Sequence, residues 1–275
     1  MGASFTNWDL QGVEPTRFVG FDNFANILTD SLFWLYLVNT FYFMFGLPLA
    51  MAGSLFAAIL LSQKLKGIVA YRAALYLPSV TAGVATMLLW KALYNPDFGP
   101  INEMIETILR LFGFRDPQGP KWLEQVSIQL KQWGIGAREA IIIMGIWASF
   151  GGGNMLLYLA ALTNVPQELV EAAELDGANR WRVFRNVTWP QLAPTTFFIL
   201  VMGVIGGMQG GFEQARVMTQ GGPAGTTTTL SYFIFNKAFT EYQLGFASAV
   251  SLILFFIILI FTIINWKFGS KEVSY

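Results

Sequence analysis

The sequence predicts an all-helical integral membrane protein with about five membrane-spanning helices. Of its 275 residues, 54% are hydrophobic and 12% are charged, whereas about a quarter of the residues in soluble domains carry charge. Long uncharged runs recur along the chain, and several approach the roughly 20 apolar residues that a helix needs to cross a bilayer.

Composition excludes several classes of function. Lys and Arg total 17, as do Asp and Glu, so there is no basic surface that predicts nucleic-acid binding. Cys and His are absent, which removes disulfides, thiolate nucleophiles, zinc sites and histidine bases. We expect no metal, no cofactor and no catalytic residues. The phosphate-binding pattern GxxxxGK[ST] does not occur, so this chain is not expected to hydrolyse ATP itself.

The N-terminal half predicts a polar segment and two spans. Residues 1–30 lack a basic n-region and an apolar h-region, so they are not a signal peptide. Residues 31–63 carry no formal charge and form the first predicted span, which we expect Pro48 to kink. Residues 73–90 are uncharged but short for a crossing, and Pro78 predicts a loop-like entry that then becomes a span.

A long loop and a third span follow. The loop 91–139 has helical periodicity in residues 101–114 and 122–130, and we expect its aromatic and leucine side chains to pack against the membrane-embedded part. The third span, residues 140–167, contains Gly151, Gly152 and Gly153 followed by Asn154. Each glycine weakens a helix by about 1 kcal/mol relative to alanine. Two interpretations stay open here: close packing of helices, or a locally opened helix that lines a solute path.

The C-terminal part predicts two more spans. The fourth covers about residues 194–212, and Gln209, Glu213 and Gln214 lie at its outer end, as part of a solute vestibule or merely solvated. Residues 218–229 have the composition of a turn-rich re-entrant or extracytoplasmic loop. Residues 231–242 predict a short amphipathic helix rich in interfacial aromatics. The last predicted span is residues 242–266.

Charge is dense between residues 164 and 194, where the pattern predicts two short helices. Pro166 suits a first turn, with Asn164 or Thr163 as its cap. Gly177 suits a positive φ at the end of the first helix, and Asn179 can cap the second. The second helix should end before Pro190. Taken alone, this pattern also fits an amphipathic surface helix with a solvated acidic face.

Particular residues within this segment carry a family resemblance. Glu171-Ala172-Ala173, then Asp176-Gly177-Ala178, then Pro190 nineteen positions after Glu171, resemble the EAA loop of permease subunits of ATP-binding-cassette (ABC) importers. Further matches are NPDFGPIN and YLPSV upstream, and FEQARVMTQGGPAGTTTTLSYFIF and GFASAV downstream. The chain is similar to the sugar-importer branch, and within it to the maltose-type and glycerol-phosphate-type first permease.

The resemblance implies a type I ABC importer permease fold in one transmembrane domain, with a cytoplasmic coupling helix. It implies four kinds of partner: a second EAA-type permease, a dimer of ATP-binding subunits, an extracytoplasmic solute-binding protein and the lipid bilayer. The family also has a span before the segment SFTNWDL, so this chain is expected to lack it. The expected ATPase-coupling residues are Glu171, Ala172, Ala173, Asp176, Gly177 and Pro190. The candidate solute-path residues are Trp147, Asn154, Gln209 and Glu213.

Charge distribution gives an orientation. Five spans put eight cations on the side of the EAA loop: Lys64, Lys66, Arg72, Arg180, Arg182, Arg185, Lys267 and Lys271. Outside the long loop 91–139, where the positive-inside rule weakens, the other side has only Arg17, Arg216 and Lys237. We therefore expect the EAA loop, residues 164–190, in the cytoplasm, residues 1–30 outside, and the protein in a bacterial or archaeal cytoplasmic membrane.

The expected function is a non-enzymatic permease subunit that forms half of the pathway for a sugar or related solute. Glycerol phosphate or a polyol is the alternative solute class. An intramembrane enzyme or a stand-alone secondary transporter would need ionisable residues inside the spans, and the predicted spans contain almost none.

Overall fold

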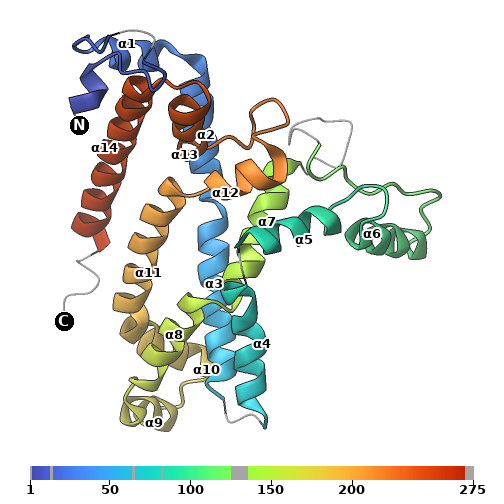
Figure 1. The fold of residues 1–275 in the computed structure, drawn as a ribbon. Helices are drawn as coiled ribbons and strands as arrows, with labels where there is room; N and C mark the ends of the chain where they lie inside the picture. Colours follow the sequence, from blue (N-terminus) through green and yellow to red (C-terminus); the bar gives the residue numbers. More distant parts are fainter. Residues whose placement is uncertain (1, 13–14, 64–65, 82, 125–135, 270–275) are drawn as a thin grey trace. The chain divides into compact units, whose positions relative to one another are not determined.

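The computed structural model describes residues 2–12, 15–63, 66–81, 83–124 and 136–269, which form helices joined by loops (Figure 1). The predictions for Lys64, Lys271 and most of residues 122–130 lie outside the described residues. The α-helices are α1 (Asp22–Thr29), α2 (Ser31–Phe43), α3 (Gly46–Leu61), α4 (Ile68–Val80), α5 (Gly83–Leu93), α6 (Pro100–Leu111), α7 (Ala137–Phe150), α8 (Gly153–Thr163), α9 (Gln167–Leu175), α10 (Arg180–Val183), α11 (Trp189–Gln209), α12 (Phe212–Gln214), α13 (Leu230–Phe235) and α14 (Leu244–Gly269). A 3₁₀-helix covers Gly2–Phe5, and π-helical turns cover Phe184–Thr188, Ala215–Thr219 and Asn236–Thr240.

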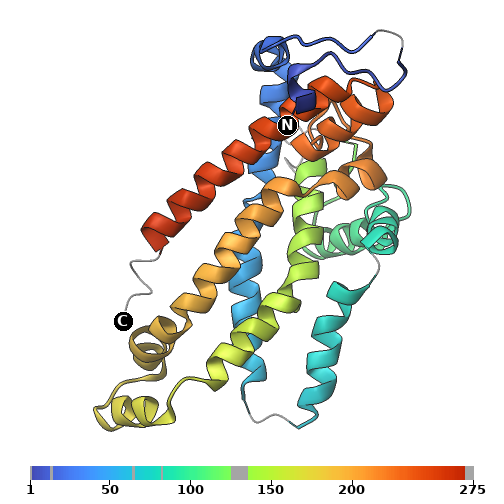
Figure 2. The same ribbon diagram turned by 60° about the vertical axis from the view of Figure 1, so that its left-hand side comes forward.

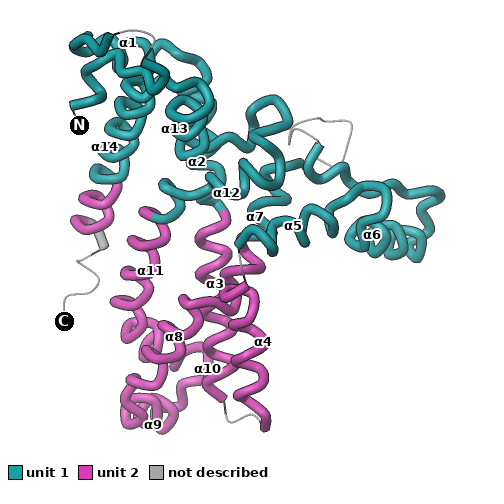
Figure 3. The backbone as a smooth tube through the Cα atoms, in the orientation of Figure 1, with its two compact units in different colours: residues 1–45, 82–144, 206–260 teal, residues 46–81, 145–205, 261–275 magenta. Residues whose placement is uncertain are grey.

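The chain forms two compact units, drawn in different colours in Figure 3. Unit 1 comprises residues 1–45, 82–144 and 206–260, and unit 2 comprises residues 46–81, 145–205 and 261–275. Helices α7, α11 and α14 therefore contribute residues to both units.

The number of spans agrees with the prediction. Within the described residues, four helical stretches are long and apolar enough to cross a membrane: Ser31–Leu61, Ala137–Thr163, Arg180–Thr219 and Leu244–Lys267. The pair Ile68–Val80 and Gly83–Leu93 adds a fifth if both helices form one broken span. The fold is thus an all-helical membrane fold with four or five spans.

Two prolines act differently from their predicted roles. The first span turns at Met44 and Phe45, whereas Pro48 lies in the first turn of α3, where its missing N–H has no intrahelical partner to lose. The second span is already helical from Ile68, so Pro78 lies inside α4 instead of in a loop-like entry. Arg72, predicted in the basic loop before this span, lies within α4, and its Nη2 donates to the carbonyl of Leu61 at the end of α3, at 3.2 Å.

The glycines of the third span lie both at an opening of the helix and at a close packing contact, whereas the solute path stays a prediction. The helix breaks between Phe150, the last residue of α7, and Gly153, the first of α8. At the break, a Cβ on Gly151 would overlap the carbonyl of Leu75, so α4 packs directly on the glycine backbone. The hydroxyl of Ser54 on α3 donates to the Ser149 carbonyl at 2.8 Å. Unit 2 thus contains an opened helix that is also closely packed.

The apolar core of unit 2 joins α3, α8 and α11. Its buried members include Met51, Ala58, Met155, Tyr158 and Ile199. The views in Figures 1 and 2 agree that α9 and α10 lie where α8 and α11 come together at one end of this unit.

Unit 1 holds its N-terminal segment through backbone hydrogen bonds. The N–H of Leu10 donates to Tyr242 at 2.9 Å, and the N–H of Gly245 donates to Trp8 at 2.9 Å. Figure 2 shows this segment beside the start of α14. Unit 1 also contains two apolar clusters. One forms around Phe33, Leu230 and Val250. The buried members of the other are Met87, Trp90, Tyr94, Trp122, Ala140, Ile141, Met144 and Met218.

The break in the third span predicts that two nearby glycines, Gly151 and Gly153, differ in their tolerance of a larger side chain. We expect Gly151→Ala to lower thermal stability, because its methyl group would overlap the Leu75 carbonyl, and overpacking typically costs about 1–3 kcal/mol. Gly153→Ala is the control, because nothing lies within 4 Å of its added Cβ. Intrinsic tryptophan fluorescence of the purified chain during heating measures both. Equal melting temperatures for the two variants would contradict this packing.

Candidate functional site

Helix α9 carries the acidic part of the EAA-like segment, and its C-terminal end is closed by backbone hydrogen bonds. The N–H of Gly177 donates to Glu174 at 3.0 Å, and the N–H of Ala178 donates to Ala173 at 3.0 Å. This pair of bonds is the Schellman motif, which needs a residue with positive φ, and Gly177 has φ +79°. The predicted conformation of Gly177 is confirmed.

The N-terminal end of α9 differs from the prediction. Pro166 occupies the cap position, with φ −62° and ψ 124°, and no side chain caps this end. Asn164 and Thr163 instead finish α8, where the Thr163 hydroxyl donates to the Ala160 carbonyl at 2.7 Å. They do not cap α9 because the turn between the helices uses them to end the preceding one.

None of the nine residues of α9 is buried in this chain. Leu175 is 89% exposed and Leu169 is 46% exposed, and Glu171, Ala172 and Asp176 are exposed with them. Ala173 is half-buried. A helix this short normally depends on tertiary packing for its stability. Helix α9 therefore exposes both apolar and acidic side chains that a partner could cover.

The second helix starts as predicted and then continues. The side chain of Asn179 accepts a hydrogen bond from the N–H of Arg182 at 2.9 Å, which confirms it as the cap. The helix does not end before Pro190: α10, the π-helical turn Phe184–Thr188 and α11 follow one another without a gap. In this turn the N–H of Trp189 donates to Phe184, five residues earlier. The wider turn accommodates the proline ring and its missing N–H, as π-turns do at helix irregularities.

The charges of this segment are unpaired within the described part of the chain. Neither the carboxylates of α9 nor the guanidinium groups of Arg180, Arg182 and Arg185 form an ion pair there. Aromatic rings lie between the arginines, with Trp181 and Phe184 stacked at 5.7 Å between centroids. Both sets of charges are therefore available to another molecule.

A cavity of about 600 Å³ adjoins the second helix inside unit 2. Its wall is mainly apolar and is formed by side chains of α3, α8, α10 and α11. Trp181, Phe184 and Trp189 form one side of it, and Arg185 contributes a charge.

The four solute-path candidates fall into two pairs. In unit 2, Trp147 lines a cavity of about 510 Å³ together with Pro78 and Gly151, and Asn154 is half-buried one residue after the start of α8. In unit 1, Gln209 and Glu213 are exposed, and the Gln209 carbonyl accepts a hydrogen bond from the Ser231 hydroxyl at 2.6 Å. Convergence of the two pairs on one pathway stays a prediction.

The sequence analysis did not identify Asn39, a buried polar residue, as a structural contact. The amide nitrogen of Asn39 on α2 donates to the carbonyls of Gly225 at 2.8 Å and Thr228 at 2.9 Å. It thereby fixes the loop before α13, and the neighbouring Thr40 hydroxyl accepts from the N–H of Leu230 at 3.0 Å. The sequence signal that could have identified Asn39 is an amide side chain within an uncharged span, because polar groups at such positions usually have a specific role.

Comparisons with known proteins identify the family. Residues 31–268 match the family described as "Binding-protein-dependent transport system inner membrane component". The chain is 33% identical to the probable ABC transporter permease protein YesP of Bacillus subtilis (strain 168), over 100% of this chain and 85% of the relative. It is 32% identical to the sn-glycerol-3-phosphate transport system permease protein UgpA of Escherichia coli O157:H7, over 98% of this chain and 87% of the relative.

The fold is also similar to solved structures. A chain of a bacterial alginate ABC transporter, crystallised in complex with an alginate pentasaccharide-bound periplasmic protein, matches with a TM-score of 0.76 and 23% identity, over 92% of this chain and 83% of that chain. A second crystal structure, of a bacterial ABC transporter involved in the import of alginate, gives a TM-score of 0.76 at 22% identity, over 94% of this chain and 85% of that chain. This chain is a multi-pass membrane protein that belongs to the family of binding-protein-dependent transport system inner membrane components.

Proposed function

We propose that this chain is one of two permease subunits of an ATP-driven importer in a bacterial or archaeal cytoplasmic membrane. The imported solute is a saccharide, with glycerol phosphate or a polyol as the alternative class. The observation that carries the proposal is helix α9, which is closed at its C-terminal end by backbone hydrogen bonds and has no buried residue.

Docking of α9 on an ATP-binding subunit accounts for its composition. Leu169, Ala172 and Leu175 supply apolar area that a partner can cover, whereas Glu171 and Asp176 can meet cations at the rim of such a contact. The sequence has no GxxxxGK[ST] motif of its own, so ATP hydrolysis belongs to the partner. Two ATP-binding subunits, a second EAA-type permease and an extracytoplasmic binding protein complete the assembly.

Coupling would run along the helix that follows α9. Closure of the ATPase pair displaces α9, and the Schellman turn at Gly177 transmits that displacement to α10. Because α10, the π-helical turn and α11 form one unbroken helical stretch from Arg180 to Gln209, a push on α10 moves the fourth span. The π-helical turn at Phe184–Thr188 is the natural place for this stretch to bend.

The solute path is proposed to pass the opened third span and the outer part of the fourth. Asn154 and Trp147 lie on either side of the Gly151–Gly152 break, and helix breaks of this kind offer backbone groups to solutes in transporters. The names of the relatives support both solute classes, because UgpA is a glycerol-3-phosphate permease by name and the structural neighbours belong to alginate transporters by title.

The coupling role predicts a selective effect of strain at Gly177. Gly177 has φ +79° and open space around its Cβ position, so Gly177→Val adds only local backbone strain, on the order of 1–3 kcal/mol. We expect normal amounts in the membrane, loss of uptake into proteoliposomes, and loss of the coupling between solute and ATP hydrolysis. Glu171→Lys keeps the turn but reverses a charge at the contact, and should also abolish uptake.

Gly67→Val is the matched control for that experiment. Gly67 has φ +75°, also has open space around its Cβ position, and lies in the same unit in a different loop. We expect it to retain uptake. Wild-type uptake by Gly177→Val, or an equal loss in both variants, would refute the coupling role of α9.

The solute path predicts that water reaches the break in the third span. The chain has no cysteine, so single substitutions report one position each. Asn154→Cys and Trp147→Cys should react with a charged, membrane-impermeant thiol reagent several-fold faster than Phe255→Cys, whose side chain lies on the outside of the apolar α14. Equal rates at the three positions would remove these residues from the path.

A further inference from the structure

Helix α6 has an apolar face that is left exposed among the described residues. Met104, Ile108 and Leu111 are spaced i, i+4 and i+7, so they form one stripe, and they are 59%, 45% and 82% exposed. Phe112, the residue after the helix, is 78% exposed. The sequence led us to expect the aromatic and leucine side chains of this loop to pack against the membrane-embedded part. Trp122 is packed in this way, whereas Leu111 and Phe112 are exposed and contradict the expectation.

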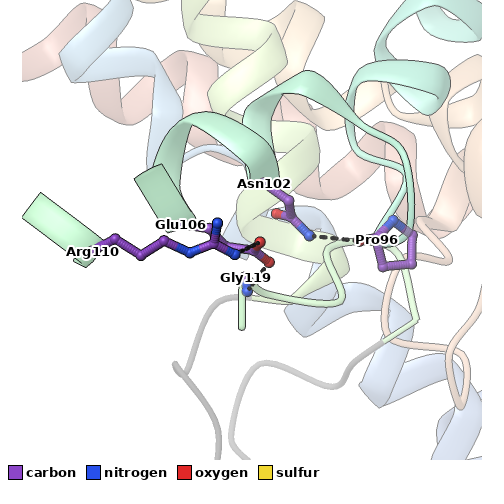
Figure 4. A network of polar contacts seen from close by, with 5 residues as sticks. All are labelled: Pro96, Asn102, Glu106, Arg110 and Gly119. Atoms are coloured by element: carbon purple, nitrogen blue, oxygen red, sulfur yellow. Dashed lines mark hydrogen bonds and ion pairs between the residues drawn. The ribbon is translucent and has the colours of Figure 1, made fainter. Parts of the chain in front are cut away.

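A second face of α6 is firmly attached to unit 1. Ile101 and Ile105 pack against the cluster of Trp90, Tyr94 and Trp122. Asn102 is buried between them, where its Oδ1 accepts from Trp122 Nε1 at 2.7 Å and its Nδ2 donates to the carbonyls of Pro96 and Pro120. Figure 4 shows the Asn102 amide directed at Pro96. The orientation of α6 is therefore fixed, and the exposed stripe is a defined surface of the protein.

The third face of α6 is polar. Glu103, Thr107 and Arg110 are exposed. Arg110 lies 3.7 Å from Glu106, whose other oxygen accepts from the N–H of Gly119 at 3.1 Å (Figure 4). The helix thus has one side on the protein core, one apolar side and one charged side.

A short connection joins α6 to a helix of the fifth candidate span. Helix α5, the second helix of that bent pair, ends at Leu93, and α6 begins seven residues later at Pro100. The connection is a tight turn: Asn95 Oδ1 accepts from the N–H groups of Asp97 and Phe98, and a Cβ on Gly99 would overlap the backbone of Leu93 and Asn95. Helix α6 is consequently held close in the chain to a helix of the fifth candidate span.

We propose that α6 is an interfacial membrane anchor, with Met104, Ile108 and Leu111 inserted among lipid acyl chains and its charged face in the headgroup layer. Helix α5, which precedes it, also leaves the apolar side chains of Val84, Leu88 and Leu89 exposed. A helix with separate apolar and charged faces beside a candidate span matches the pattern of helices that lie in the membrane interface. The anchor would hold the outer end of α5 at a constant depth while other parts of a transport assembly move.

The occupant of this surface is bulk phospholipid, without preference for anionic headgroups. The segment from Asp97 to Lys121 has four acidic side chains (Asp97, Glu103, Glu106 and Asp116) and three basic ones (Arg110, Arg115 and Lys121). This near balance provides no net attraction to a negative surface. Binding therefore depends on buried apolar area.

Site-directed spin labelling tests this proposal, and the natural absence of cysteine allows single labels without a modified background. Labels are placed at Ile108 and Leu111 on the apolar face, and at Glu103 and Thr107 on the polar face as matched controls. All four side chains are exposed, so labels there disturb little packing. The full chain, in its purified assembly, is reconstituted into phosphatidylcholine vesicles, and collision rates with oxygen and with the water-soluble nickel complex Ni-EDDA are measured.

We expect labels at Ile108 and Leu111 to collide more with oxygen than with Ni-EDDA, and labels at Glu103 and Thr107 to show the reverse. Adding phosphatidylglycerol should leave the pattern unchanged. A dominance of Ni-EDDA at all four positions would show α6 in water, and low collision rates with both reagents at Ile108 and Leu111 would show a protein partner instead. A pattern that appears only with phosphatidylglycerol would indicate an anionic-lipid site. Each of these three outcomes overturns the proposal, and none depends on the proposed transport function.

Discussion

The absence of water from a bilayer interior requires each backbone N–H and C=O of a span to find a partner within the protein. This constraint governs the places where the helices of this chain depart from regularity. At the break after Phe150, the Ser149 carbonyl is bonded by the Ser54 hydroxyl from a neighbouring helix. At the loop before α13, Asn39 bonds the carbonyls of Gly225 and Thr228. Irregular backbone is tolerated where a side chain supplies the missing partner.

Helix α9 lies outside the candidate spans, and the segment around it is built differently. Its helix is closed by its own backbone bonds at Gly177, and its side chains are left uncovered. The helix that follows enters the fourth span without interruption through a π-helical turn. An exposed, rigid element joined directly to a span is well suited to pass movement between a soluble partner and the membrane domain.

Sequence reasoning succeeded where a local rule decides the outcome. The number of spans follows from uncharged length, and Gly177 and Asn179 follow from helix-end chemistry, so both were predictable. It failed where a neighbour in space decides. We expected Pro190 to end a helix. No local sequence pattern predicts the π-helical turn that accommodates this proline. The exposure of Leu111 was also missed, since periodicity identifies an apolar face but does not reveal whether protein or lipid covers it.

The central claim is that α9 docks on a separate ATP-binding subunit, and thiol protection tests it most directly. Ala172→Cys is placed in the natural cysteine-free chain, with Gln63→Cys as an exposed control on a different helix end. Both are treated with a membrane-impermeant maleimide, with and without the purified ATP-binding subunits. We predict that these subunits protect Ala172→Cys strongly and leave Gln63→Cys unchanged. Equal labelling of Ala172→Cys with and without them would contradict the account.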